Sequence, residues 1–238
     1  MNKQRLSGWA AAIFVISSST SALADDGDNH FQIGVRTGYS VFAGKIYDPS
    51  SICFAGQCFS NDIFGTSHVV SGQVPLWLDA GYQITPNLML GLYGQYGFVT
   101  LDSDCSGCSA HDIRFGIQAQ YRFRPAGKLD PWLGLGVGYE SLSLHQGYPE
   151  QQGFTQPVEP TSADSTFRGW ELANLQGGVD FRLGSAFTLG PFLSVSLDEF
   201  THQSIDYNYP GVANVDGSIY DKAVHEWITL GVKGSFGI

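Results

Sequence analysis

The sequence predicts an all-β fold, an eight-stranded antiparallel transmembrane β-barrel that is preceded by a cleavable signal peptide. Three observations support this prediction. Apolar and polar residues alternate through eight long segments, the connections between the segments are alternately short and long, and aromatic residues gather at both ends of the apolar faces. Side chains two residues apart in a strand project to the same face, so each segment has one apolar and one polar side.

The beginning of the chain has the three parts of a secretory signal peptide. Lys3 and Arg5 make it basic, residues 8–16 form an apolar run, and the sequence ALA at residues 22–24 is a small-residue cleavage site. The apolar run is too short to cross a bilayer as a helix, which needs about 20 residues. We therefore divide the chain into a signal peptide (1–24), a short N-terminal periplasmic segment (25–30) and an outer-membrane β-barrel domain (31–238).

The charge balance argues against one class of partner. The chain has 12 Lys and Arg against 22 Asp and Glu, and without Lys3 and Arg5 the mature chain has 10 against 22, a formal charge of −12. No basic stripe remains, so nucleic acid is not an expected partner. No stretch of the mature chain is apolar over the about 20 residues that a membrane helix needs. No motif in the sequence leads us to expect a cofactor or a metal.

Residues 111–125 illustrate the alternation. Ile113, Phe115 and Ile117 lie on one face, whereas Asp112 and Arg114 lie on the other. A tilted strand needs about 9–11 residues to cross a bilayer, and each of the eight segments is long enough. The segments are residues 31–42, 72–84, 88–100, 111–125, 131–144, 166–183, 189–200 and 223–236.

Connections of two lengths alternate along the chain. Those after the second, fourth and sixth segments are short, whereas those after the first, third, fifth and seventh mostly run longer. An even number of strands with short turns at one end and long loops at the other is typical of outer-membrane barrels. In such a barrel both termini and the short turns face the periplasm, and the long loops are extracellular. The long connections are residues 43–71, 101–110, 145–165 and 201–222.

Alternation alone does not decide which face meets water, because a soluble barrel has polar side chains outside and apolar ones inside. The aromatic residues of the apolar face favour a membrane barrel, since they form two bands around a zone of Leu, Val and Ile, as rings do at the two membrane interfaces. We therefore expect the apolar face to meet lipid. The band at the short-turn end is Phe31, Tyr82, Tyr121, Phe123, Phe181 and Phe236, and the band at the long-loop end is Tyr39, Tyr96, Phe98, Tyr139 and Phe167.

Several segments resemble small eight-stranded bacterial outer-membrane β-barrel proteins, and most of all the predicted barrels of this kind whose function is uncharacterised. They are SGQVPLWLDAGYQITPNLMLGLYGQYGF, PWLGLGVGYE and HEWITLGVKGSFGI, and the resemblance covers the mature chain from Phe31. The last strand resembles the assembly signal that such barrels present to the insertion machinery, through Thr229, Gly231 and Phe236. It differs at Gly234, where an apolar residue is usual. The resemblance implies outer-membrane lipids and the barrel-insertion machinery as partners, and a monomer.

The interior of an eight-stranded barrel is narrow enough for side chains to fill it. Charges of both signs lie on the polar faces in nearly equal number, and paired charges would close the lumen, because an isolated buried charge is costly. Counting from the short-turn end places Arg36 level with Asp79 and Arg114 close to Glu140, within the few residues that barrel stagger allows. The predicted lumen charge network is Arg36, Asp79, Arg114, Glu140, Arg168, Asp180, Arg182, Asp198 and Lys233, with Arg122 and Asp112 on the same faces. The tryptophans expected inside are Trp77, Trp132, Trp170 and Trp227.

Four cysteines lie in the first two long loops, Cys53 and Cys58 in one and Cys105 and Cys108 in the other. An even number of cysteines in an exported chain first suggests disulfides. The local pairs 53–58 and 105–108 are the simplest, crossed pairs between the loops are an alternative, and a zinc site that uses all four is another.

The leading hypothesis for function is a non-enzymatic integral barrel with a plugged polar lumen, which has a structural or surface-interaction role through its extracellular loops. A narrow passive channel for small solutes or apolar molecules is the alternative. A lipid-modifying enzyme is a third, because His202 and Ser204, with Asp206 and Asp216 beyond them, resemble the His-x-Ser arrangement of lipid A deacylases on this type of barrel. Fold alone does not choose among these functions.

Overall fold

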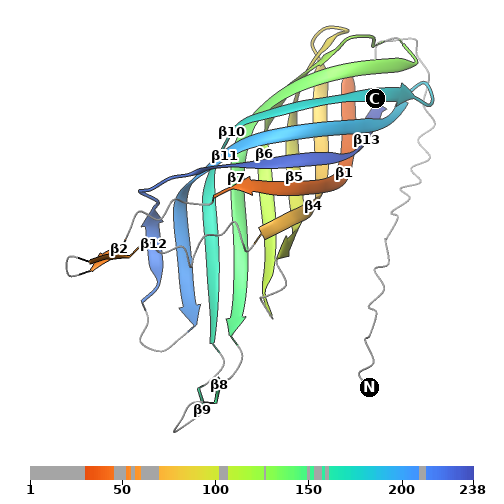
Figure 1. Ribbon diagram of the computed structural model, residues 1–238. Coiled ribbons are helices and arrows are strands. Elements are labelled where there is room, and N and C mark those ends of the chain that lie inside the picture. The colour runs from red at the N-terminus through yellow and green to blue at the C-terminus, as the bar shows by residue number, and fades with distance from the viewer. Residues whose placement is uncertain are drawn as a thin grey trace, which may run out of the picture.

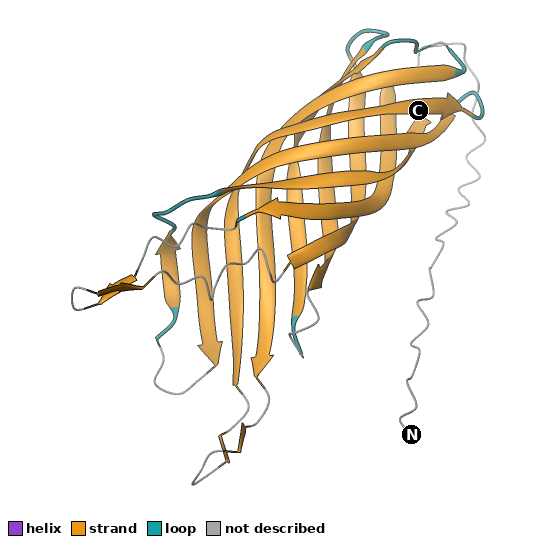
Figure 2. Ribbon diagram, in the orientation of Figure 1, coloured by secondary structure: helices purple, strands orange, loops and turns teal. Residues whose placement is uncertain are grey.

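The computed structural model describes residues 30–45, 52–54, 57–59, 70–101, 107–125, 127–148, 151–152, 157–158, 161–208 and 213–238. In this part of the chain all regular elements are β-strands (Figure 2), and no helix is long and apolar enough to cross a membrane. The predicted signal peptide, 1–24, lies outside the described residues.

Eight strands form a closed antiparallel barrel, which confirms the predicted fold. Each pairs with the next barrel strand along the chain, and β1 pairs with β13 to close the wall. The barrel strands are β1 (Phe31–Gly44), β4 (Val70–Gln83), β5 (Leu88–Leu101), β6 (Ser109–Arg122), β7 (Leu129–Tyr148), β10 (Thr161–Arg182), β11 (Phe187–Asn208) and β13 (Val224–Gly237). Short strands in the connections are β2 (Ile52–Phe54) with β3 (Gln57–Phe59), β8 (Gln151–Gln152) with β9 (Pro157–Val158), and β12 (Val215–Ser218) beside β11.

The two ends of the barrel differ, as the connection lengths predict. One end, which we call the turn end, has the three short connections and the C-terminus, and the other, the loop end, has the long connections (Figure 1). At the loop end β7, β10 and β11 are 20, 22 and 22 residues long, against 14 in each of the other barrel strands. With β12 they extend the wall on one side well past the rest (Figure 1). The expectation that 201–222 is a loop was therefore wrong for 201–208 and 215–218.

The outer surface of the barrel is apolar and the interior is polar. Leu78, Leu92 and Leu230 are 59%, 61% and 66% exposed, whereas Arg36 and Trp77 on the other faces of the wall are 0% and 1% exposed. A soluble barrel would have the reverse distribution, so the wall is built to contact lipid. All six aromatic residues predicted at the turn end are exposed on the outside: Phe31, Tyr82, Tyr121, Phe123, Phe181 and Phe236.

One strand departs from the predicted facing. On β10 the residues Leu172 and Ala173 together lie opposite Val137 alone, so the strand contains a bulge. One extra residue exchanges the two faces of a strand beyond the bulge. Side chains of β10 between the bulge and the loop end therefore point to the face opposite to the one that unbroken alternation predicts. Arg168 and Trp170, predicted inside, are therefore on the outside, with Trp170 57% exposed. Phe167, predicted in the outer aromatic band, is buried.

Trp170 allows a direct test of this change of phase. Bromine on a lipid chain quenches the fluorescence of tryptophans that contact it, so Trp170 should supply most of the quenching when the protein is reconstituted in brominated phosphatidylcholine. We expect Trp170→Phe to remove most of the quenching and the matched change Trp227→Phe, at a buried side chain, to leave it. Equal quenching in the two variants would contradict the outward position of Trp170.

Candidate functional site: the filled lumen

The turn-side half of the lumen is organised around Arg36 of β1, which is fully buried. Its guanidinium donates two hydrogen bonds to the Asp79 carboxylate, both 2.6 Å long, and further bonds to Gln118 (2.8 Å) and Gln176 (2.5 Å). The same group lies 4.7 Å from the ring centre of Trp77. The expected Arg36–Asp79 pair is therefore present, and amide and aromatic groups from other strands surround it on the remaining sides.

Two more cations complete this turn-side layer. Lys233 donates to Gln120 (2.9 Å) and lies 3.8 Å from Asp180, and Arg122 contacts Asp130 at 2.5 Å. The buried groups of the layer are thus three cations, Arg36, Arg122 and Lys233, and three carboxylates, Asp79, Asp130 and Asp180. Sequence reasoning missed Asp130 because that residue ended the predicted turn, whereas β7 already begins at Leu129.

The loop-side half is organised around Arg114 of β6, and here charge does not balance. Arg114 donates to Asp112 and to Glu140, each at 2.9 Å, and lies 3.8 Å from Glu171 and 3.9 Å from Asp198. All four carboxylates are at most 1% exposed. The expected Arg114–Glu140 pair is present, but the expectation of nearly equal inward charge was wrong, since one arginine serves four carboxylates.

The loop-side layer has further donors from β13. His225, fully buried, contacts Glu140 through Nε2 at 2.8 Å, and Trp227 donates to the same carboxylate at 3.0 Å. Three potential metal-ligand atoms in this layer lie within 4.8 Å of one another, a spacing that could hold a metal ion, and they belong to Glu140, Asp198 and His225. Arg114, His225 and Trp227 already occupy both Glu140 oxygens, so this group fits a charge network better than a metal centre.

Glu171 is a lumen residue that sequence reasoning missed, and its partner is Tyr93. The Tyr93 hydroxyl donates to the Glu171 carboxylate. A Cβ at Gly116 or Gly138 would lie 2.6 Å or 2.5 Å from this hydroxyl, so both positions require glycine. On the lipid side the same glycines help to line an apolar groove of about 620 Å³ beside Trp170. A signal for Glu171 existed, because the unbroken phase of residues 166–183 would have turned this carboxylate toward lipid.

An apolar cluster fills the lumen on the loop side of Arg114. Its buried members come from β7, β10, β11 and the residue after β12. The backbone N–H of Ile219 donates to the Thr201 carbonyl at 3.0 Å, which holds that segment against β11. The buried members are Leu142, Leu144, Phe167, Phe200 and Ile219, and Phe42, Val99, Leu101 and Ala110 pack against them. From the turn end the lumen thus contains the turn-side layer, in which charge is balanced, then the loop-side layer, which we call the acidic layer, and then the apolar cluster.

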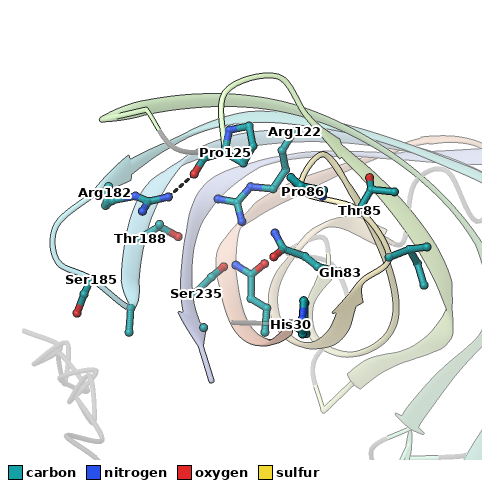
Figure 3. Close-up of a pocket in the computed structure, with 14 residues that line it drawn as sticks. His30, Gln83, Thr85, Pro86, Arg122, Pro125, Arg182, Ser185, Thr188 and Ser235 are labelled. Atoms are coloured by element: carbon teal, nitrogen blue, oxygen red, sulfur yellow. Dashed lines mark hydrogen bonds between the residues drawn. The ribbon is translucent and has the colours of Figure 1, made fainter. Parts of the chain in front are cut away.

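A cavity of about 370 Å³ opens at the turn end, and we call it the vestibule (Figure 3). Arg122 lies in its wall, but neither Arg36 nor Arg114 does, so the vestibule ends at the turn-side layer. Arg182, predicted to belong to the charge network, is instead exposed here and donates to the Pro125 carbonyl.

The remaining predicted residues lie apart from the lumen centre or take part in the wall. Thr229 shares a 2.7 Å hydrogen bond with Ser40, while Phe236 is 55% exposed on the outside. A Cβ at Gly231 would lie 2.2 Å from the Thr37 carbonyl oxygen, so the wall itself requires this glycine. The assembly role of Thr229, Gly231 and Phe236 stays a prediction.

Three of the cysteines are in described parts of the long connections, at positions 53, 58 and 108. Cys53 and Cys58 are direct register partners in the β2–β3 pair. Cys105 lies outside the described residues, and Cys108 is not a free thiol. The connectivity among the four stays a prediction.

The residues of the enzyme hypothesis lie on the β11–β12 extension. His202 contacts Asp216 at 3.4 Å, and both are exposed. Ser204 is directly opposite Asp216 in the strand pair. Within the described part of the chain no hydrogen bond joins Ser204 to His202, so the nucleophile of a triad is not connected to its base.

No family model and no curated protein matches the sequence. Solved structures of outer-membrane proteins do match, at low identity. Neisserial surface protein A is 12% identical, with 87% of this chain and 97% of that chain covered and a TM-score of 0.47. OprG from Pseudomonas aeruginosa is 13% identical (90% and 99% covered, TM-score 0.48), and the outer-membrane protease OmpT from Escherichia coli is 9% identical (88% and 97%, TM-score 0.45). These likenesses describe the barrel fold and do not assign a role.

The acidic layer predicts opposite effects for two substitutions. Arg114→Gln leaves four buried carboxylates without their arginine and should lower the free energy of unfolding by about 3–5 kcal/mol. Asp198→Asn removes one excess negative charge from the layer and leaves Arg114 paired with Asp112 and Glu140 at 2.9 Å, so it should leave stability unchanged or raise it. Urea unfolding of the protein in lipid vesicles, followed by tryptophan fluorescence, measures both. A loss in Asp198→Asn as large as that in Arg114→Gln would contradict this account.

Proposed function

We propose that the protein is an integral outer-membrane barrel that does not conduct, and that it has a structural or surface-interaction role through the loop end. In this proposal the turn end and both termini face the periplasm, the long loops are extracellular, and the barrel is a monomer surrounded by outer-membrane lipid. Its partners are those lipids, the insertion machinery, and a ligand of the loops whose chemistry the described residues do not define.

The filled lumen is the observation that carries the proposal. An ion that crossed the barrel would have to pass the turn-side layer around Arg36, the acidic layer around Arg114 and the apolar cluster in turn. Separating Arg36 from Asp79 would leave a buried charge unpaired, at a cost of about 3–5 kcal/mol. The side chains of the apolar cluster cannot replace the water shell of an ion.

The loop end offers the surface for interaction. The strands β7, β10 and β11 carry side chains past the rest of the barrel, and the exposed polar groups there include Asp164 and Asp216, with 60% and 73% of their side chains exposed. Tyr220, which follows β12, is 94% exposed. A non-enzymatic role fits this surface better than catalysis, because the His202–Asp216 pair is not connected to Ser204 by a hydrogen bond in the described chain.

Single-channel recording tests the closed lumen. The purified protein in a planar bilayer should give no reproducible conductance steps. Arg36→Ala should also stay silent, because the Arg114 layer and the apolar cluster remain in place. Insertion of each sample is checked by its heat-dependent mobility on gels. Reproducible steps from the wild type, enlarged in Arg36→Ala, would instead support the channel alternative and make the charge layer a gate.

Cysteine labelling tests the orientation. Tyr220→Cys at the loop end should react with a membrane-impermeant maleimide on intact cells, because that side chain is 94% exposed. The matched variant Ser185→Cys, in an exposed turn at the opposite end, should react only after the outer membrane is opened. The wild type gives the background from the native cysteines. The reverse pattern of labelling would overturn the proposed orientation.

A further inference from the structure

We propose that the vestibule at the turn end binds a phosphate ester. This site lies apart from the filled lumen and the loop surface, and it would bind its ligand whether or not the barrel conducts. Its wall combines two guanidinium groups, two hydroxyls without a hydrogen-bond partner and several apolar side chains (Figure 3).

The charged side chains in the described wall of the vestibule are two arginines. Among the described residues, the lining includes Arg122 and Arg182 and no carboxylate. Arg182 is exposed, and in the described part of the chain its only hydrogen-bond acceptor is the Pro125 carbonyl, so most of its donors point to water. In Figure 3 the side chains of Arg182 and Arg122 point toward each other. A guanidinium with free donors is suited to bind an oxyanion through paired hydrogen bonds.

Arg122 is a fixed donor rather than a source of net charge. Its carboxylate partners, Asp130 at 2.5 Å and Asp180 at 3.9 Å, lie on its inner side and are themselves buried. Neither is part of the vestibule wall. These contacts hold the Arg122 side chain in place, so that a ligand would meet an ordered donor beside Arg182, which has no carboxylate partner among the described residues.

Two hydroxyls in the wall supply an independent sign of a ligand. Ser235 and Thr188 are directly opposed across the β11–β13 pair, and their side-chain oxygens are buried without a hydrogen-bond partner among the described residues. Ser235 is only 1% exposed, and both residues line the cavity. Because buried polar groups normally have partners, these hydroxyls indicate a polar group between them and the arginines. A tetrahedral oxyanion has enough acceptor oxygens for all four side chains.

The rest of the wall indicates that the anion carries an organic group. Ile84, Pro86 and Ala186 give the vestibule an apolar side, and a volume of about 370 Å³ exceeds what inorganic phosphate alone needs. A phosphate ester satisfies both sides of the cavity. Two sources share this chemistry: a soluble phosphorylated metabolite, and the headgroup of a phospholipid in the adjoining leaflet.

Calorimetric titration of the purified protein in neutral detergent tests the site. Glycerol 3-phosphate is the probe, with glycerol and sodium chloride as reference solutes. We expect saturable binding that weakens at least tenfold in Arg182→Gln and severalfold in Ser235→Ala. The matched control is Arg124→Gln, an exposed arginine of the same turn region that is not in the wall, and it should bind as the wild type does. Gel mobility confirms that each variant is folded.

These outcomes distinguish a specific phosphate-ester site from nonspecific attraction of anions to the arginines of the turn end. Absence of saturable binding to any phosphate ester, or an equal loss in Arg124→Gln and Arg182→Gln, would overturn it. Repeating the titration in nanodiscs distinguishes the sources. Phosphatidylglycerol that competes with glycerol 3-phosphate, where phosphatidylcholine does not, would identify a lipid headgroup, and unchanged binding in both would identify a soluble ester.

Discussion

Closure of the hydrogen-bonded wall is the constraint on which the rest of this structure depends. Lipid offers no partner to a backbone N–H or C=O group, so each strand must satisfy both edges by pairing with neighbours. The β1–β13 pair completes this requirement, with register partners from Gln32–Gly237 to Gly44–His225. Once the wall is closed, the outer face that contacts lipid must be mainly apolar, and the charge layers lie inside.

The interior must then satisfy its polar groups without bulk water. Arg36 achieves this with four hydrogen bonds to three residues from three other strands. Arg114 likewise joins Asp112 on its own strand to Glu140 on β7 and Ser196 on β11. Each arginine therefore links side chains from opposite parts of the wall. The charge layers make the barrel a rigid filled cylinder, and function is left to its two ends.

The sequence was sufficient to predict the eight strands, the facing of most of their side chains and two ion pairs. The strands and their facing follow from the period of two, and their order and direction follow from the lengths of the connections. Arg36–Asp79 and Arg114–Glu140 could be anticipated since β-sheet neighbours have a limited stagger. The bulge at Leu172 and Ala173 could not be read from alternation, which assumes an unbroken phase. Glu171 on the side assigned to lipid was the available sign of it.

The vestibule and the acidic layer lay beyond sequence reasoning for a different reason. Both are assembled from residues on strands far apart in the chain, such as Arg122, Arg182 and Ser235. Their proximity depends on the curvature and shear of the closed barrel, which local patterns do not contain. The same holds for the apolar cluster, where Ile219 reaches the lumen only because β12 folds back along β11.

The register of the closing strands has a consequence for how the barrel folds. Arg36 and Lys233 are direct partners across the β1–β13 pair, so closure sets two cations opposite each other. Like charges in that position oppose pairing. Their counterions, Asp79 and Asp180, come from β4 and β10. We therefore expect the two edges to pair at low cost only when β4 and β10 are already in place.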